Sequence, residues 1–231
     1  MPLKVDAVFI PALLCDEQLY QDLIAACSSQ ISPVVLMSPK PNLAESCADI
    51  LARAPAKFVL VGTSYGGNLA LEIALSAPER VVGLWLMGCD PGAPQQGGPD
   101  LASALEVMPK GVIDMLAGLV VCQSDTASVT AFRQMAARVG YVAGAAQARA
   151  MASRDNRAAR LGELSMPTLL TWGAEDPLVP LTVGEAMERR VPNAVLHVLN
   201  ACGHLPTLEK PDQTAALFSG LVGQVRAKWK P

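Results

Sequence analysis

Short apolar segments alternate with helical segments along most of the chain, and this alternation is the feature that most restricts the fold. The segments 58–62 and Val81–Met87 are continuously apolar and rich in β-branched residues, which is typical of strands buried on both faces of a sheet. Between them Tyr65–Ser76 has helical spacing, and Pro78 follows its end. Strands joined through helices run parallel with right-handed crossovers. The sequence therefore predicts an α/β fold with a mostly parallel sheet covered by helices on both faces.

The same patterns predict the other elements of this fold. The expected strands are Val5–Ile10, 34–37, 58–62, Val81–Met87, 168–172 and Ala194–Leu199. The expected helices are 17–27, 42–54, Tyr65–Ser76, 183–190 and Pro211–Lys228. Asp16 and Asn42 stand where the first two helices need an N-cap, and Glu45 follows Asn42 at capping-box spacing.

Composition excludes several classes of protein. The chain has 231 residues, of which 51% are hydrophobic and 17% charged, so it has enough apolar surface to fold around a core. Its apolar runs are shorter than the roughly 20 residues of a membrane-spanning helix, so no membrane span is expected. The net charge is −3 and no basic stretch is present, which argues against a nucleic-acid partner.

The cysteines and histidines do not form a metal-binding pattern. Six cysteines are scattered along the chain without a C-x-x-C pair, and there are two histidines. We expect buried free thiols in a reducing, cytoplasmic location, with no metal and no cofactor.

The segment 91–164 interrupts the alternation of strands and helices. It opens with a Pro/Gly/Gln-rich loop over 91–99 and continues as an Ala-, Met- and Arg-rich stretch with helical spacing and no clear strand. We predict a helical cap inserted between two strands, so that 1–90 and 165–231 together form the core domain.

A G-x-S-x-G pattern, with Ser64 at its centre, lies between an expected strand and an expected helix. Such a turn is sharp and strained, and it needs small residues two positions before and after the serine, where Gly62 and Gly66 stand. The alternative is a glycine-rich turn of a nucleotide-binding fold, but the G-x-G-x-x-G fingerprint of that fold is absent. We therefore predict that Ser64 is a nucleophile.

A nucleophilic serine needs a base, and the base needs a carboxylate. His204 lies in the loop after the strand Ala194–Leu199, where open α/β sheets place their sites, whereas His197 lies inside that strand. Asp176 follows another expected strand and is the predicted acid. Glu175 and Asp90 remain alternatives for this role.

The order Ser64, Asp176, His204, each on a loop after a strand, resembles the α/β-hydrolase superfamily. The matching stretches cover nearly the whole chain: Pro11-Ala12-Leu13-Leu14-Cys15-Asp16, Gly62-Thr63-Ser64-Tyr65-Gly66-Gly67, Ala77-Pro78-Glu79-Arg80-Val81, Gly173-Ala174-Glu175-Asp176-Pro177 and Gly203-His204-Leu205-Pro206. Within the superfamily the chain is most similar to small bacterial carboxylesterases, such as the methyl ester esterase of biotin synthesis.

The resemblance implies several features beyond the triad. The backbone N–H groups of Leu13 and Tyr65 would form the oxyanion hole, although Pro11-Ala12 stands where the family often has His-Gly. The chain begins at the family's third strand, so the sheet would have about six strands and lack the antiparallel edge hairpin. The segment 91–164 would be the helical cap of the family.

The expected function is therefore cleavage of a small-molecule carboxylic ester with a mainly apolar acyl group. Thioester hydrolysis, C–C bond hydrolysis and acyl transfer on the same triad are alternatives, as is a non-catalytic binding protein with this fold. Solvated helix faces are the expected role of the arginines in the segment 91–164, and the alternative is that one or two of them receive an anionic substrate or an acidic carrier protein. The six are Arg133, Arg138, Arg149, Arg154, Arg157 and Arg160. The sequence does not determine the oligomeric state.

Overall fold

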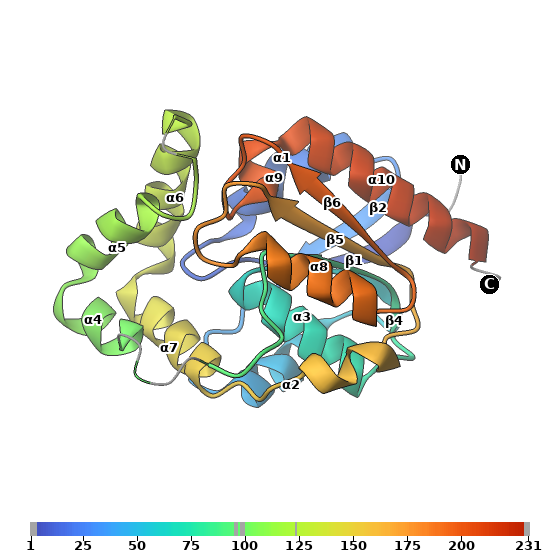
Figure 1. The fold of residues 1–231 in the computed structure, drawn as a ribbon, viewed down its shortest axis with the longest axis horizontal. Coiled ribbons are helices and arrows are strands. Elements are labelled where there is room, and N and C mark those ends of the chain that lie inside the picture. The colour runs from blue at the N-terminus through green and yellow to red at the C-terminus, as the bar shows by residue number, and fades with distance from the viewer. Residues whose placement is uncertain (1–3, 95–96, 98–99, 123, 229–231) are drawn as a thin grey trace.

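The described residues are organised around one parallel sheet of six strands (Figure 1). The computed structural model describes residues 4–94, 97, 100–122 and 124–228. Neighbouring strands pair in the order β2-β1-β3-β4-β5-β6, and every pair is parallel. The strands are β1 (Val5–Ile10), β2 (Ile31–Val35), β3 (Phe58–Thr63), β4 (Val81–Met87), β5 (Thr168–Gly173) and β6 (Ala194–Leu199). The predicted α/β class, the strand number and the parallel direction are confirmed.

Helices cover both faces of this sheet (Figure 1). On one face lie α1 (Gln21–Ala26) and α10 (Pro211–Lys228), which contact each other. On the other face lie α2 (Leu43–Arg53), α3 (Tyr65–Ser76) and α8 (Leu181–Arg190). In the described ranges, no helix is both long and apolar enough to cross a membrane.

Each face of the sheet has its own hydrophobic core. Beneath α1 and α10, the Phe218 ring stacks on Trp85 with centroids 5.4 Å apart and meets Phe9 edge-on at 5.6 Å. The opposite core contains Phe58 and Trp172, both fully buried. Strands with both faces covered must be apolar throughout, which is why the sequence pattern identified them.

In the described residues between β4 and β5, four α-helices lie beyond the carboxyl ends of the strands (Figure 1). They are α4 (Leu101–Val107), α5 (Pro109–Ala117), α6 (Thr126–Val139) and α7 (Tyr141–Ala152), followed by the 3-10 helix η2 (Ala158–Glu163). The described part of 91–164 contains no strand. Of the loop expected over 91–99, residues 95–96 and 98–99 lie outside the described residues.

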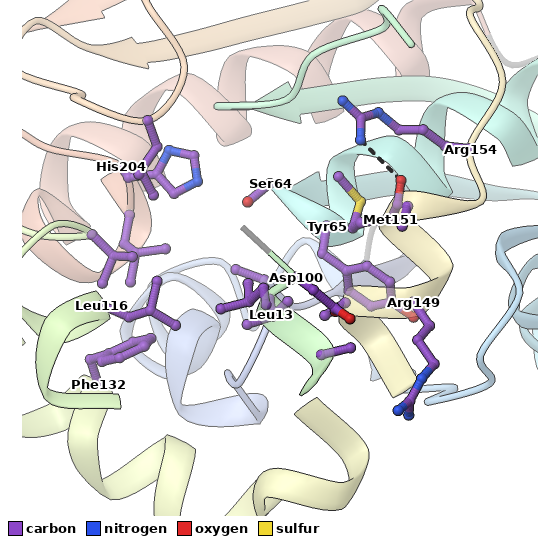
Figure 2. A pocket seen from close by; sticks show the side chains of 18 residues that line it. Leu13, Ser64, Tyr65, Asp100, Leu116, Phe132, Arg149, Met151, Arg154 and His204 are labelled. Atoms are coloured by element: carbon purple, nitrogen blue, oxygen red, sulfur yellow. Dashed lines mark hydrogen bonds between the residues drawn. The ribbon is translucent and has the colours of Figure 1, made fainter. Parts of the chain in front are cut away.

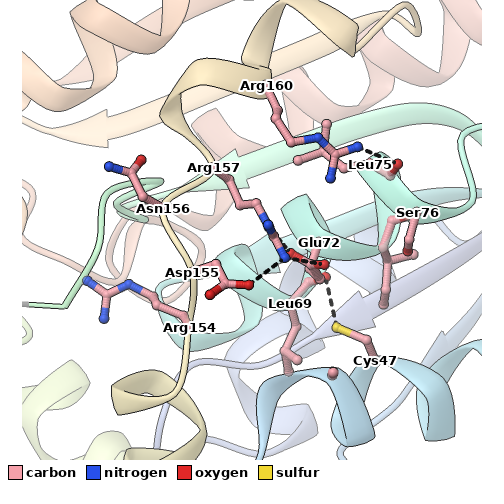
Figure 3. A network of polar contacts seen from close by, with 12 residues as sticks. Cys47, Leu69, Glu72, Leu75, Ser76, Arg154, Asp155, Asn156, Arg157 and Arg160 are labelled. Carbon is pink, nitrogen blue, oxygen red and sulfur yellow. Dashed lines mark hydrogen bonds and ion pairs between the residues drawn. The ribbon is translucent and has the colours of Figure 1, made fainter.

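A network of ion pairs connects the end of this helical segment to α3 (Figure 3). The Arg157 guanidinium donates two hydrogen bonds to the Glu72 carboxylate, at 2.6 and 3.0 Å, and a third to Asp155 at 3.1 Å. The side chains of Arg157 and Glu72 are only 25% and 17% exposed. The Arg157 N–H also donates to the Pro91 carbonyl at 2.7 Å. Pro91 and Arg157 lie near the two ends of the segment 91–164, which is called the helical segment below. Both ends are thereby held beside α3, the helix that follows Ser64.

The second strand differs from its predicted position. We expected 34–37, whereas β2 spans Ile31–Val35. Its pairing with β1 begins at Ile31 opposite Val5, and the edge position allows Pro33 within the strand because no further strand needs its missing N–H. The sequence pattern favoured 34–37 because a proline within an apolar run, here Pro33, argues against a strand at that position.

Two helical predictions also need correction, and one short helix was missed. The expected helix 17–27 is a 3-10 turn, Glu17–Tyr20, followed by the short α1. The Tyr20 hydroxyl lies in the core 2.8 Å from Thr63 Oγ1, and this tertiary contact accompanies the break in the helix. Helix α8 begins two residues earlier than the expected 183, and the short α9 (Pro206–Glu209) was not predicted.

Two close backbone approaches shape the turn between β3 and α3. A Cβ at Gly66 would lie 2.0 Å from the Ile10 carbonyl oxygen, and one at Gly62 would lie 2.2 Å from the Gly66 oxygen. Since both neighbours are backbone atoms, no side chain can move aside to make room.

The Gly66→Ala substitution should therefore destabilise the protein by about 3 kcal/mol or more, at the upper end of overpacking effects. Gly220→Ala is the matched control, because Gly220 is exposed on α10 with open space around it. It should stabilise the protein by up to about 1 kcal/mol through helix propensity. Urea unfolding measures both. Equal stability of the two variants would contradict the close approach at Gly66.

Candidate active site

Ser64 occupies a strained backbone position between β3 and α3. Its φ of 54° and ψ of −115° lie where side chains are rare, and it is the N-cap residue of α3. The Ser64 N–H donates to the Met87 carbonyl at 2.8 Å, which ties the turn to the end of β4. The side chain is partly exposed and lines a pocket. This is the geometry expected of the predicted nucleophile turn.

His204 and Asp176 form a buried pair. The Nδ1 atom of His204 lies 2.7 Å from Oδ2 of Asp176, and the two side chains are 3% and 1% exposed. The second oxygen of Asp176, Oδ1, accepts the N–H groups of Leu178 and Val179 at 2.9 and 3.0 Å. Because Nδ1 faces the carboxylate, Nε2 remains for contact with the pocket. Figure 2 shows the Ser64 hydroxyl directed toward the side of the pocket where the His204 ring lies.

The alternative residues for the acid and the base lie elsewhere. Glu175 accepts a hydrogen bond from the Cys122 thiol at 2.8 Å and from the Ala201 N–H at 3.1 Å. Asp90 accepts the N–H of Gly92 at 2.8 Å. His197 is exposed on the edge strand β6. Of the three candidate carboxylates, Asp176 is the one in contact with His204.

Gly88 provides the space for this pair, and sequence reasoning missed it. It follows β4 with a φ of +50°, and a Cβ there would lie 3.0 Å from the His204 ring and 3.3 Å from Asp176 Oδ2. A glycine directly after a buried strand is the only signal in the sequence, and it does not reveal which side chains approach.

Glu209 braces the loop that carries His204, and this residue was also missed. Its carboxylate accepts the N–H groups of Gly203 and Leu205, on either side of His204, at 2.9 and 3.2 Å. It accepts the Cys122 N–H as well, at 2.8 Å. Burial raises the pKa of Glu209, while these three hydrogen bonds oppose the rise. The His204 loop is therefore held against the helical segment.

The predicted oxyanion donors both line the pocket. Tyr65 is the first residue of α3, where a backbone N–H has no partner within the helix. Among the described residues, no hydrogen bond uses the Leu13 N–H as donor. The next residue, Leu14, has a φ of 61°, and its N–H donates to Gln147 Oε1 on α7 at 2.9 Å. A buried side chain of the helical segment thus supports the loop that carries Leu13.

The pocket has a volume of about 320 Å³ and a mainly apolar lining. Leu13, Ser64 and His204 come from the sheet and its loops, whereas Leu116 and Phe132 come from the helical segment (Figure 2). In the described ranges, no group of three His, Cys, Asp or Glu side chains is arranged to hold a metal ion.

The sequence matches known hydrolases. The family model described as Alpha/beta hydrolase family matches residues 25–217. A 2-hydroxy-6-oxononadienedioate/2-hydroxy-6-oxononatrienedioate hydrolase from Cupriavidus pinatubonensis is 32% identical over 166 residues, which are 63% of this chain and 55% of that protein. A protein of the same name from Dechloromonas aromatica is 31% identical over 68% of this chain and 59% of that protein. The chain therefore matches little more than half the length of these relatives.

Solved structures share the fold. A thermophilic esterase from Thermogutta terrifontis superposes with a TM-score of 0.85 over 96% of this chain and 90% of that chain, at 21% identity. At this identity the likeness concerns the fold alone.

Replacing Asp176 with Asn should lower kcat on an ester substrate on the order of a thousandfold, because the amide cannot hold the imidazole in the required tautomer. The controls Glu175→Asn and Asp90→Asn should keep kcat within about a factor of three of wild type. Steady-state kinetics on each purified, folded variant measures the effect. Near-normal activity of the Asp176 variant would move the acid role to another carboxylate.

Replacing Gln147 with Met should leave the buried Leu14 N–H without an acceptor, at a cost of about 1–3 kcal/mol in stability. We also expect kcat to fall by up to about a hundredfold, since the Leu13 donor loses its support. Gln134→Met on the exposed side of α6 is the control and should change stability by less than about 0.5 kcal/mol. Unchanged kcat in the Gln147 variant would show that the loop does not need this support.

Proposed function

The chain belongs to the alpha/beta hydrolase family, and on this premise we propose that it is a serine hydrolase that cleaves a small-molecule carboxylic ester through an acyl-enzyme on Ser64. The observation that carries the proposal is the buried His204–Asp176 pair beside the pocket that Ser64 lines. A buried imidazole held by a carboxylate at Nδ1 is suited to take and return a proton at Nε2.

The proposed reaction has two halves. The Ser64 oxygen attacks the ester carbonyl while His204 takes the serine proton, and the N–H groups of Leu13 and Tyr65 stabilise the oxyanion. The C–O bond to the alcohol then breaks, and His204 gives its proton to the leaving alcohol. In the second half, water attacks the acyl-enzyme, its proton passes through His204 to Ser64, and the carboxylic acid leaves. Asp176 stabilises the imidazolium in both halves. No cofactor takes part.

In this proposal 91–164 is a cap domain over the core formed by 1–90 and 165–231. The lining of the pocket by both parts supports this division, because a cap that covers the serine shields it from bulk solvent and forms the acyl site. The six cysteines, all unpaired, support a cytoplasmic location. The apolar lining supports a substrate with a mainly apolar body.

C–C bond hydrolysis is the second candidate, and the names of the relatives favour it. A 2-hydroxy-6-oxo-dienedioate has a ketone and no ester, so its hydrolysis breaks a C–C bond. Such a reaction needs the same oxyanion donors and the same serine and histidine. Thioester hydrolysis and acyl transfer remain alternatives without a specific observation in their favour.

Labelling with a fluorophosphonate probe tests the proposal. We expect wild type to be labelled at Ser64, as mapped by peptide mass spectrometry, and Ser64→Ala to be unlabelled. His204→Ala should label at least a hundredfold more slowly, because the serine loses its base. A panel of p-nitrophenyl esters, acyl thioesters and a 6-oxo-dienoic acid then ranks the reactions.

Absence of labelling in a folded wild-type protein would contradict nucleophilic catalysis and leave a binding protein with a hydrolase fold. Turnover of the 6-oxo-dienoic acid well above that of every ester would favour the second candidate.

A further inference from the structure

One arginine of the helical segment differs from the others in its partners. Five of the six pair with carboxylates: Arg133 with Asp114, Arg138 with Asp16, Arg149 with Glu106, Arg157 with Glu72 and Arg160 with Glu163. In the part of the chain that the structure describes, no carboxylate forms an ion pair with Arg154. Its hydrogen bonds go to the backbone carbonyls of Gly92 and Met151 instead.

Arg154 is also one of the residues that line the pocket of Ser64. The Nε atom donates to Gly92 at 3.1 Å and Nη1 donates to Met151 at 3.0 Å, which holds the guanidinium in place. Among the described residues, no hydrogen bond uses Nη2. In the view of Figure 2, the Arg154 guanidinium and the His204 ring lie on opposite sides of Ser64.

The charge of Arg154 is not balanced by the other charged side chains that line the pocket. Asp100 accepts hydrogen bonds from the N–H and the hydroxyl of Ser103, and Arg149 pairs with Glu106. Burial lowers the pKa of the Arg154 guanidinium, while the more distant charge of Asp90 opposes the shift. A partly desolvated cation in an apolar pocket is stabilised by an anion that enters the same pocket.

We propose that Arg154 forms an anion subsite, which selects substrates that carry a carboxylate remote from the scissile carbonyl. The substrate class is then a monoester of a dicarboxylic acid, with its carbonyl at Ser64, its apolar body in the pocket and its free carboxylate at the Arg154 guanidinium. This inference rests on the proposed function, because it concerns the substrate of the same pocket. It refines the expected apolar acyl group by adding a charge at its far end.

The test compares p-nitrophenyl monoesters of succinate, adipate and suberate with the methyl-capped diester of each. Wild type should prefer the best monoester over its capped partner by roughly tenfold or more in kcat/KM, the effect of a charge-assisted hydrogen bond. The difference should lie mainly in KM, because the contact is remote from the reacting carbonyl. Arg154→Met should lose this preference and retain its rate on the capped esters. Arg154→Lys should keep part of it.

Arg149→Met is the matched control, since Arg149 lines the same pocket but is paired with Glu106. It should retain the wild-type preference. Equal preference in wild type and Arg154→Met would overturn the proposal. So would an equal loss of rate on monoester and capped ester in a folded Arg154→Met, which would mean that Arg154 only holds Gly92 and Met151 together.

A binding measurement separates this inference from the catalytic proposal. Adipate should raise the melting temperature of Ser64→Ala and leave that of the Ser64→Ala/Arg154→Met double variant unchanged. If no ester is cleaved in a Ser64-dependent way, the proposed function fails and the adipate shift alone decides the anion subsite. No adipate shift in Ser64→Ala would then overturn it.

Discussion

The close approach of three backbone segments at the start of α3 is the constraint on which the rest of the structure depends. The Gly66 backbone lies against the Ile10 carbonyl and beside Gly62, so the helix can begin directly beneath the ends of β1 and β3. This contact holds Ser64 in the left-handed region and places it at the ends of the central strands. Residues that follow β1, β5 and β6 then reach the same pocket, because parallel strands end at the same edge of the sheet.

The helical segment between β4 and β5 is part of the architecture of the site. Polar contacts join it to the core at separate places: Arg157 to Glu72 on α3, Gln147 to the Leu14 N–H, the Val120 carbonyl to the His204 N–H, and the Cys122 N–H to Glu209 on α9. These contacts involve buried or partly buried groups, so their loss leaves polar atoms without partners. The position of the helical segment and the geometry of the pocket are consequently coupled.

Much of the fold could be predicted from local patterns, and the misses have physical causes. The buried central strands are apolar on both faces, so their sequence is unambiguous. The edge strand β2 tolerates Pro33 and exposes part of its length, which weakens its signal. The helix expected over 17–27 is broken where Tyr20 bonds to Thr63 in the core, and a contact across 43 residues leaves no trace in local periodicity.

By itself, the sequence determined the class of fold and the turn at Ser64, and it limited the predicted partners of Ser64 to a short set of residues, because strand pattern, glycine spacing and loop position are local properties. Only the tertiary structure shows that Asp176, rather than Glu175 or Asp90, contacts His204, and only it singles out Arg154 among the six arginines. The physical reason is that a hydrogen bond or an ion pair depends on distances of a few ångströms between residues far apart in the chain. Those distances are set by how the helical segment and the sheet pack together.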